Sequence, residues 1–257
     1  DNTPRIVRVK GTITLEPFGR KMNVGSNKTI IGIGADATIA QGGFRAINQS
    51  NIILRNLTIR DSYVEGDDAG KENDFDGFQI DNSHHIWIDH CHFTRLGDGL
   101  IDSRKGTDYI TISWCILSNH NKTFGIGWTD RTDWHMTIHH TWFRNTQRRN
   151  PSFDQGIGHL FNNYFQNLSV HGLNVRGGAR VLLENSVFEN VNSPIIYSGE
   201  DAALVARGNI FKNAPGAANP RGEAVDPRKF YEYELAPAEH VPALLRAGAG
   251  PQANIGN

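Results

Sequence analysis

Residues 87–93 read WIDHCHF, and the pattern of this heptapeptide recurs in six other stretches of the chain. In each stretch apolar and polar residues alternate, and the last residue is bulky and apolar. From Phe93 onward, each of these last residues follows the previous one by 22–26 positions. Ile59 precedes Phe93 by 34 positions, and the longer interval contains an acidic insertion, VEGDDAGKENDFDG. The related stretches are IILRNLTI (52–59), TISWCIL (111–117), IHHTWF (138–143), GHLFNNYF (158–165), LLENSVF (182–188) and VARGNIF (205–211).

This repeat predicts a solenoid. Short alternating strands at a period in the low twenties, without helices between them, are typical of parallel strands that stack coil on coil. Leucine-rich repeats have a similar period, but their regular leucines and Asn-x-Leu spacing are absent. We therefore predict an all-β parallel β-helix, in which residues one period apart stack at about 4.8 Å. Phe93 should belong to an internal apolar stack that continues from coil to coil.

The two cysteines follow the same step. Cys91 and Cys115 are 24 residues apart, as are Phe93 and Leu117, so we expect the thiols to be stacked neighbours. Stacking does not fix the torsion that a disulfide needs, so bonded and free thiols both stay open. The same rung should continue as a ladder of small polar residues at a turn, through Thr141, Asn163, Ser186 and Asn209.

Length and composition indicate one domain. A chain of 257 residues can bury a sizeable core, and nothing in it reads as a linker. We expect a single domain over 1–257, with an extension at about 213–257 packing on the outside and containing one amphipathic helix at 238–248. The first residues, DNTPRIVRVKGTITL, lie almost inside a β-like segment, so we expect upstream residues to have been removed.

Charge and hydropathy argue against two classes of partner. The formal net charge is −1 and no basic stripe is present, so nucleic acid is not an expected partner. The same charge argues against an anionic membrane surface, and no apolar run is long enough to cross a bilayer.

Carboxylates gather in two stretches. NDFDGF (73–78) contains Asp74 and Asp76, and GDGLID (97–102) contains Asp98 and Asp102, which share one face of an extended strand. Asp76 precedes Asp98 by 22 residues, about one coil, so Asp76, Asp98 and Asp102 can converge. Converging carboxylates repel unless a cation lies between them, and ligands that are all oxygen suit Ca²⁺. A solvated acidic surface is the alternative, which spacing alone leaves open.

Cations gather one coil further along. Lys122 lies in NHNKTFG (119–125), and Arg149 follows it by 27 residues in QRRNPSFD (147–154). His171 and Arg176 lie about one coil later, in VHGLNVRGG (170–178). Positive and negative clusters on adjacent coils indicate a groove for a polyanion that a metal bridges. Ordinary surface cations are the alternative.

Several stretches, in order, resemble the pectate lyases of polysaccharide lyase family 1. The resemblance covers nearly the whole chain and implies a right-handed parallel β-helix, in agreement with the repeat. It also implies a secreted, extracellular enzyme, which we expect to act as a monomer on polygalacturonate or pectin. The matching stretches are VGSNKTIIGIGADATI (24–39), FDGFQI (75–80), HHIWIDHC (84–91), DGLIDSRKGTDYITISW (98–114), NHNKTFGIG (119–127) and RRNPSFDQGIGHLFNNYF (148–165).

The resemblance implies a role for each matching residue. Asp76, Asp98 and Asp102 take the positions of calcium ligands, Lys122 that of the lysine on the substrate carboxylate, and Arg149 that of the base. Calcium and Lys122 would neutralise the carboxylate next to the C5 proton that β-elimination removes. An arginine side chain has a pKa above 12, so an arginine base implies an alkaline optimum. The expected substrate-binding residues are Lys122, Arg148, His171 and Arg176.

The chain departs from the family pattern at two positions. Asp154 stands where the motif has its second arginine, and Asn121 stands where an acid usually precedes the lysine. Two alternatives stay open. An acid in the groove favours a lyase on methyl-esterified pectin or another uronate polymer, although the three calcium acids count against pectin. The other alternative is a polysaccharide-binding β-helix with little or no catalysis. Ultraviolet absorbance of an unsaturated product distinguishes the lyases from the binding protein.

Overall fold

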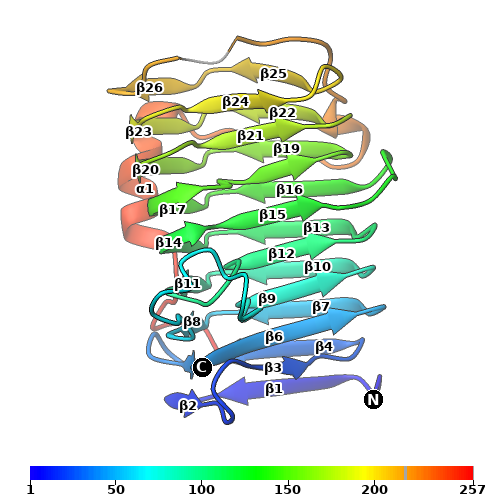
Figure 1. Cartoon of the computed structure of the whole chain (residues 1–257), viewed down its shortest axis with the longest axis vertical. Coiled ribbons are helices and arrows are strands. Elements are labelled where there is room, and N and C mark those ends of the chain that lie inside the picture. Colours follow the sequence, from blue (N-terminus) through cyan, green and yellow to red (C-terminus); the bar gives the residue numbers. More distant parts are fainter. Residues whose placement is uncertain (217–218, 257) are drawn as a thin grey trace.

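The computed structural model describes residues 1–216 and 219–256, which form a column of short strands (Figure 1). Successive coils contribute strands to three sheets of nine, nine and eight strands, and neighbouring strands within each sheet pair in parallel from one coil to the next. The front strands run to the right and the back strands to the left as the chain rises, so the coil is right-handed. The predicted right-handed parallel β-helix is confirmed.

The three sheets are labelled A, B and C. Sheet A contains β1 (Arg5–Val9), β4 (Lys28–Gly32), β7 (Ser50–Arg55), β10 (His84–Asp89), β13 (Asp108–Ser113), β16 (His135–His139), β19 (Ile157–Phe161), β22 (Arg180–Glu184) and β25 (Ala203–Arg207). Sheet B contains β2 (Thr12–Thr14), β5 (Thr38–Ala40), β8 (Thr58–Arg60), β11 (His92–Thr94), β14 (Ile116–Lys122), β17 (Trp142–Arg148), β20 (Tyr164–Leu168), β23 (Val187–Val191) and β26 (Ile210–Lys212). Sheet C contains β3 (Arg20–Asn23), β6 (Gly42–Ile47), β9 (Phe78–Asp81), β12 (Ile101–Arg104), β15 (Phe124–Gly127), β18 (Ser152–Asp154), β21 (Leu173–Arg176) and β24 (Ile195–Ser198).

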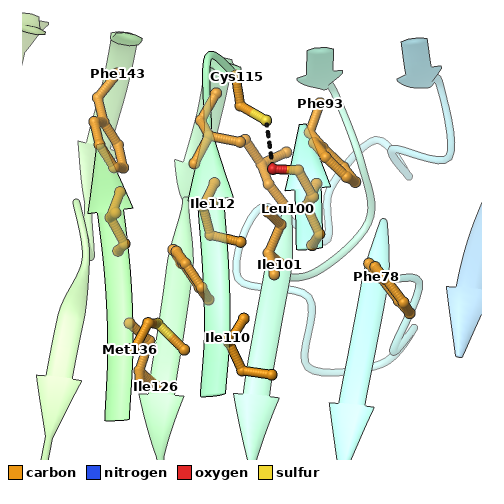
Figure 2. Close-up of a cluster of buried hydrophobic side chains, with 14 of the residues drawn as sticks. Phe78, Phe93, Leu100, Ile101, Ile110, Ile112, Cys115, Ile126, Met136 and Phe143 are labelled. Carbon is orange, nitrogen blue, oxygen red and sulfur yellow. Dashed lines mark hydrogen bonds between the residues drawn. The ribbon is translucent and has the colours of Figure 1, made fainter. Parts of the chain in front are cut away.

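The core is a set of apolar stacks inside the column. The predicted stack is confirmed, because register pairs join Ile59, Phe93, Leu117, Phe143, Phe165, Phe188 and Phe211 in order. The ring centroid of Phe165 lies 4.8 Å from that of Phe143 and 4.3 Å from that of Phe188. Figure 2 shows such side chains meeting from all three sheets. Burial on this scale is the main force that holds a solenoid together.

The cysteines lie where the repeat places them. The backbone N–H of Cys91 points at Sγ of Cys115 at 3.4 Å, so the predicted stacking is confirmed. Both thiols are free and buried, and burial raises the pKa of the Cys115 thiol well above its ordinary value. The predicted polar ladder on this rung is confirmed too, because side-chain oxygens of Asn163, Ser186 and Asn209 each accept an N–H from the preceding coil, at 3.0, 3.1 and 2.8 Å.

A second ladder was not predicted. Five asparagines with φ between 46° and 57° turn the chain after the first residues of the sheet B strands. Their side-chain amides bond from coil to coil at 2.8–3.3 Å. Asparagine tolerates this left-handed conformation better than other residues with a Cβ, and its amide both donates and accepts. The members are Asn119, Asn145, Asn167, Asn190 and Asn213.

After β26 the chain turns back along the outside of the column (Figure 1). It contains the short helices η1 (Pro227–Lys229), η2 (Ala238–His240) and α1 (Val241–Gly248). Val241 and Leu245 pack with Trp142 and Tyr164 of sheet B in a second apolar cluster. Near its end, the N–H of Gln252 donates to Oδ1 of Asn56 at 2.7 Å. No helix in the described part of the chain is long and apolar enough to cross a membrane.

Candidate functional site

The predicted site residues gather on the outer face of sheet C and at its border with sheet B. Side chains in a strand alternate between the two faces, so every second residue of sheet C points outward. One outward row pairs Gln79, Asp102 and Gly125 in register. Lys122 and Arg148, paired in register, end β14 and β17 just before the chain enters sheet C.

The acidic insertion lies in the loop over 61–77, between β8 and β9, and the carbonyl of Phe75 in this loop accepts the N–H of Gly97 at 3.1 Å. The carboxylate of Asp67 accepts the backbone N–H groups of Lys71, Glu72 and Asn73 at 2.9, 3.2 and 3.0 Å. This bonding fixes the turn that precedes Asp74 and Asp76, so both acids reach the sheet from an ordered loop.

Four carboxylates then converge, and we call them the acid cluster: Asp74, Asp76, Asp98 and Asp102. Oxygens of Asp74, Asp76 and Asp98 all lie within 4.8 Å of one another. Oδ1 of Asp76 accepts the N–H of Gly99 at 3.0 Å. A Cβ added to Gly99 would lie 2.6 Å from Oδ1 of Asp102 and 3.3 Å from Oδ1 of Asp76, so Asp102 faces the same glycine. The structure therefore brings together the three predicted acids and adds Asp74.

The electrostatics of the acid cluster favour a bound cation. Burial raises the pKa of Asp76 to about 6, although Lys21 opposes the rise. Burial, together with the charge of Asp76, raises the pKa of Asp102 to about 8. Burial also raises the pKa of Asp98, against its ion pair with Lys122. Carboxylates that resist ionisation because they are buried side by side gain most when a cation neutralises them.

Lys21 is a cation in this cluster that the sequence did not indicate. From β3 its Nζ donates to Asp74, Asp76 and Gln79 at 2.9, 3.0 and 2.7 Å. The Lys21 side chain passes over Gly43 in the intervening coil to reach these groups. A Cβ at position 43 would lie 2.5 Å from the carbonyl oxygen of Asp76, so only glycine fits there. No periodic spacing links Lys21 to the acids, so sequence reasoning had no signal to find it.

The residues present fit a calcium ion. All donors in the cluster are oxygens, as Ca²⁺ prefers. Oδ1 of Asp102 is buried and has no hydrogen-bond partner among the described residues. An ionised oxygen that is buried without a partner is costly, and a cation in the cluster would remove the cost.

The two predicted catalytic cations flank the acid cluster. Nζ of Lys122 forms an ion pair with Oδ1 of Asp98. Arg149 lies in the turn between β17 and β18, and its positive charge opposes the raised pKa of both Asp98 and Asp102. Neighbouring Arg148 is exposed. The structure therefore places Lys122 and Arg149 beside the acids.

The other predicted substrate-binding residues lie one coil further along. Burial lowers the pKa of His171, whose Nδ1 donates to the carbonyl of Gly172 at 3.1 Å. Arg176 pairs in register with Asp154, and both are half-buried on the outer face of sheet C. No ion pair joins them within residues 1–216 and 219–256. Asp154 therefore lies on the same sheet face as Asp102 and has no ion-pair partner among the described residues.

The departure at Asn121 has a structural reason. Its side-chain amide donates to the backbone carbonyl of Asp68 at 2.7 Å and so ties β14 to the insertion loop. An ionised acid has no proton to donate there. The preceding residue, His120, is half-buried, and the loss of solvation lowers its pKa to about 4, while its Nε2 donates to the carbonyl of Asp98. Both residues therefore help to place the acids.

Comparison with known proteins agrees with this geometry. The family model described as pectate lyase matches residues 18–252. A pectate trisaccharide-lyase of Thermotoga maritima is 33% identical, over 95% of this chain and 76% of its own length. One of Bacillus licheniformis is 33% identical, over 97% of this chain and 75% of its own.

Solved structures share the fold. A pectate lyase of Bacillus sp. N165, in complex with trigalacturonate, matches with a TM-score of 0.84 and 28% identity, covering 98% of this chain and 86% of its own. A pectate lyase of Acidovorax avenae subsp citrulli matches with a TM-score of 0.80 at 18% identity, covering 98% of this chain and 84% of its own. From its β-helix, its site and these likenesses, the chain belongs to the pectate lyase family of polysaccharide lyases.

Proposed function

We propose that the protein cleaves 4-linked α-galacturonan, or pectate, by calcium-dependent β-elimination with Arg149 as the base. The observation that carries this proposal is that the acid cluster, Lys122 and Arg149 lie beside one another at the border of sheets B and C. The trigalacturonate complex of the similar Bacillus enzyme supports a galacturonan as the substrate class. The names of the Thermotoga and Bacillus relatives support it too.

The acid cluster is the part that would hold calcium. Asp76, Asp98 and Asp102 supply oxygens from two adjacent coils, with Asp74 beside them. Bound Ca²⁺ would supply positive charge next to the substrate carboxylate and to the negative charge that develops there. Because the cluster lies beside Lys122, a uronate carboxylate held at this place would contact protein cations as well.

Lys122 and Arg149 would have different roles in the elimination. Lys122 would pair with the uronate carboxylate, which makes the neighbouring C5 proton easier to remove. Arg149 would take that proton, and the C5–H electron pair would form the C4–C5 double bond. The C4–O bond would break with its electron pair on the glycosidic oxygen, which solvent would protonate to give the hydroxyl of the released chain. Within the described chain, no hydrogen bond or ion pair occupies the guanidinium of Arg149, so it can face a substrate. Free arginine is protonated at neutral pH, so turnover should rise toward alkaline pH.

Calcium titration combined with turnover tests the proposal. Calorimetry should show calcium binding to the wild-type protein and weaker binding to Asp98→Asn. Asp133→Asn is the matched control, because the side chain of Asp133 is 78% exposed and pairs with Arg131 away from the cluster. Turnover of polygalacturonate should fall with Asp98→Asn and not with the control. Full turnover in excess EDTA would exclude a calcium-dependent mechanism.

Asp154 favours one variation of this function. An unpaired acid on the substrate face repels a fully ionised polymer, so a partly methyl-esterified pectin is the second candidate substrate. Initial rates on polygalacturonate and on esterified pectin separate the two. We also propose that the protein acts outside the cell, where polymeric galacturonan is accessible, and as a monomer. Detection in the culture medium and light scattering test these two points.

A further inference from the structure

The backbone of Arg149 is fixed although its side chain is not. Its φ is 60°, and its carbonyl accepts the N–H of Phe124 at 2.8 Å. The next residue, Asn150, is buried, and its amide donates to the carbonyl of His171 at 2.9 Å. In contrast, across residues 1–216 and 219–256 the guanidinium has no hydrogen bond or ion pair. Its one ring contact is with Trp128, whose ring centroid lies 5.5 Å from Cζ.

Trp128 is itself held against sheet C. It follows β15 with a φ of 51°, and 44% of it is exposed. A Cβ added to Gly125 would lie 2.5 Å from Cη2 of the indole and 2.8 Å from Oδ1 of Asp102. Only glycine at position 125 therefore leaves room for the indole, whose edge contacts the strand beside Asp102.

We propose that Trp128 is a positioning residue for Arg149. In this role the indole of Trp128 holds the guanidinium of Arg149 beside the acid cluster. This inference rests on the proposed function, in which Arg149 is the base. An arginine side chain that is free in solution must lose rotamer entropy before it can act from one place. A cation–π contact of about 0.5–2 kcal/mol, equivalent to roughly 2- to 30-fold in an equilibrium, would restrict that freedom. Gly125, Trp128 and Arg149 thus form a chain of contacts from the sheet to the base.

Three variants test this role on polygalacturonate. Trp128→Leu keeps an apolar side chain but removes the ring, and should lower kcat by roughly 2- to 30-fold, the range that the cation–π contact corresponds to. Trp128→Phe keeps a ring and should recover part of the loss. KM and calcium affinity should change little in both, because neither the acid cluster nor Lys122 is touched.

Trp87→Leu is the third variant and the matched control. Trp87 is 37% exposed, and its ring centroid also lies 5.5 Å from an arginine Cζ, that of Arg55, but on sheet A. Wild-type kcat in Trp87→Leu, together with a loss in Trp128→Leu and partial rescue in Trp128→Phe, supports the inference. Wild-type kcat in Trp128→Leu overturns it, and so does a rise in KM alone, which would make Trp128 a sugar contact.

A common loss of activity and thermal stability in the Leu and Phe variants also overturns the inference, since it would show a purely structural role. These outcomes differ from failure of the proposed function itself. A wild-type protein that forms no unsaturated product would contradict that function. An active wild type with unaffected Trp128 variants contradicts the positioning role alone.

Discussion

Replacing Asp102 by asparagine should stabilise the calcium-free protein at alkaline pH. Burial and the charge of Asp76 raise the pKa of Asp102 from the ordinary 3.8 to about 8. Between about pH 4 and pH 8 the folded protein therefore keeps a proton that the unfolded chain has released. Stability of the calcium-free protein must then fall as the pH rises through this window.

The size of the effect follows from the pKa. At 1.36 kcal/mol per pKa unit, the change from 3.8 to about 8 corresponds to at most about 6 kcal/mol lost by pH 8. For a chain of this length that is up to roughly 12–24 °C in Tm. Asparagine has nearly the same shape and no charge, so Asp102→Asn should remove this loss. Asp76, with a pKa raised to about 6, should leave a smaller slope below that pH.

Thermal unfolding in EDTA from pH 5 to pH 9 measures the prediction. The Tm of Asp102→Asn should exceed that of the wild type least at pH 5, and the difference should grow toward pH 9. Calcium at a hundredfold excess over its Kd should stabilise the wild type by about 2.7 kcal/mol and the variant by less. A wild-type Tm that is independent of pH, or a variant less stable at pH 9, would refute the reasoning.

Three further predictions concern other parts of the molecule. Arg149→Ala should remove nearly all turnover but leave calcium affinity intact in calorimetry, and Arg149→Lys should not restore it fully, because lysine lacks the planar fork; an active Arg149→Ala enzyme would mean that the base lies elsewhere. Asp154→Arg should lower KM for polygalacturonate, because it replaces a repulsion with an attraction, and an unchanged KM in steady-state assays would show that Asp154 does not face the substrate. Phe165→Ala should cost about 3–5 kcal/mol in denaturant unfolding, since Phe165 is fully buried between two stacked rings; a cost below about 1 kcal/mol would contradict the stacked core.

The coils could be predicted from the sequence because backbone pairing between neighbouring coils fixes the spacing of the residues that stack on one another. Phe93, Leu117 and Phe143 recur at the step that hydrogen bonding between coils requires, so their stacking could be read directly. The asparagine ladder obeys the same step from Asn145 to Asn167, and the same comparison would have found it.

The site was harder to predict because its contacts join residues that are not one coil period apart in the sequence. Lys122 pairs in register with Arg148 and not with Arg149. Turns of different lengths make the number of residues per coil vary, so the spacing alone does not identify the partner. Lys21 reaches the acids over a glycine in the intervening coil, and Trp128 lies in a turn outside the repeat. Contacts of this kind depend on where side chains point, which the spacing of residues does not record.

Ultraviolet absorbance of the products from polygalacturonate, with calcium and with EDTA, tests the central claim most directly. β-Elimination leaves a C4–C5 double bond next to a carboxylate, so absorbance should rise with time when calcium is present. It should stay flat in EDTA and recover when calcium is restored. New chain ends without any rise in absorbance would show hydrolysis in place of elimination, and would contradict the proposed roles of Arg149, Lys122 and the acid cluster.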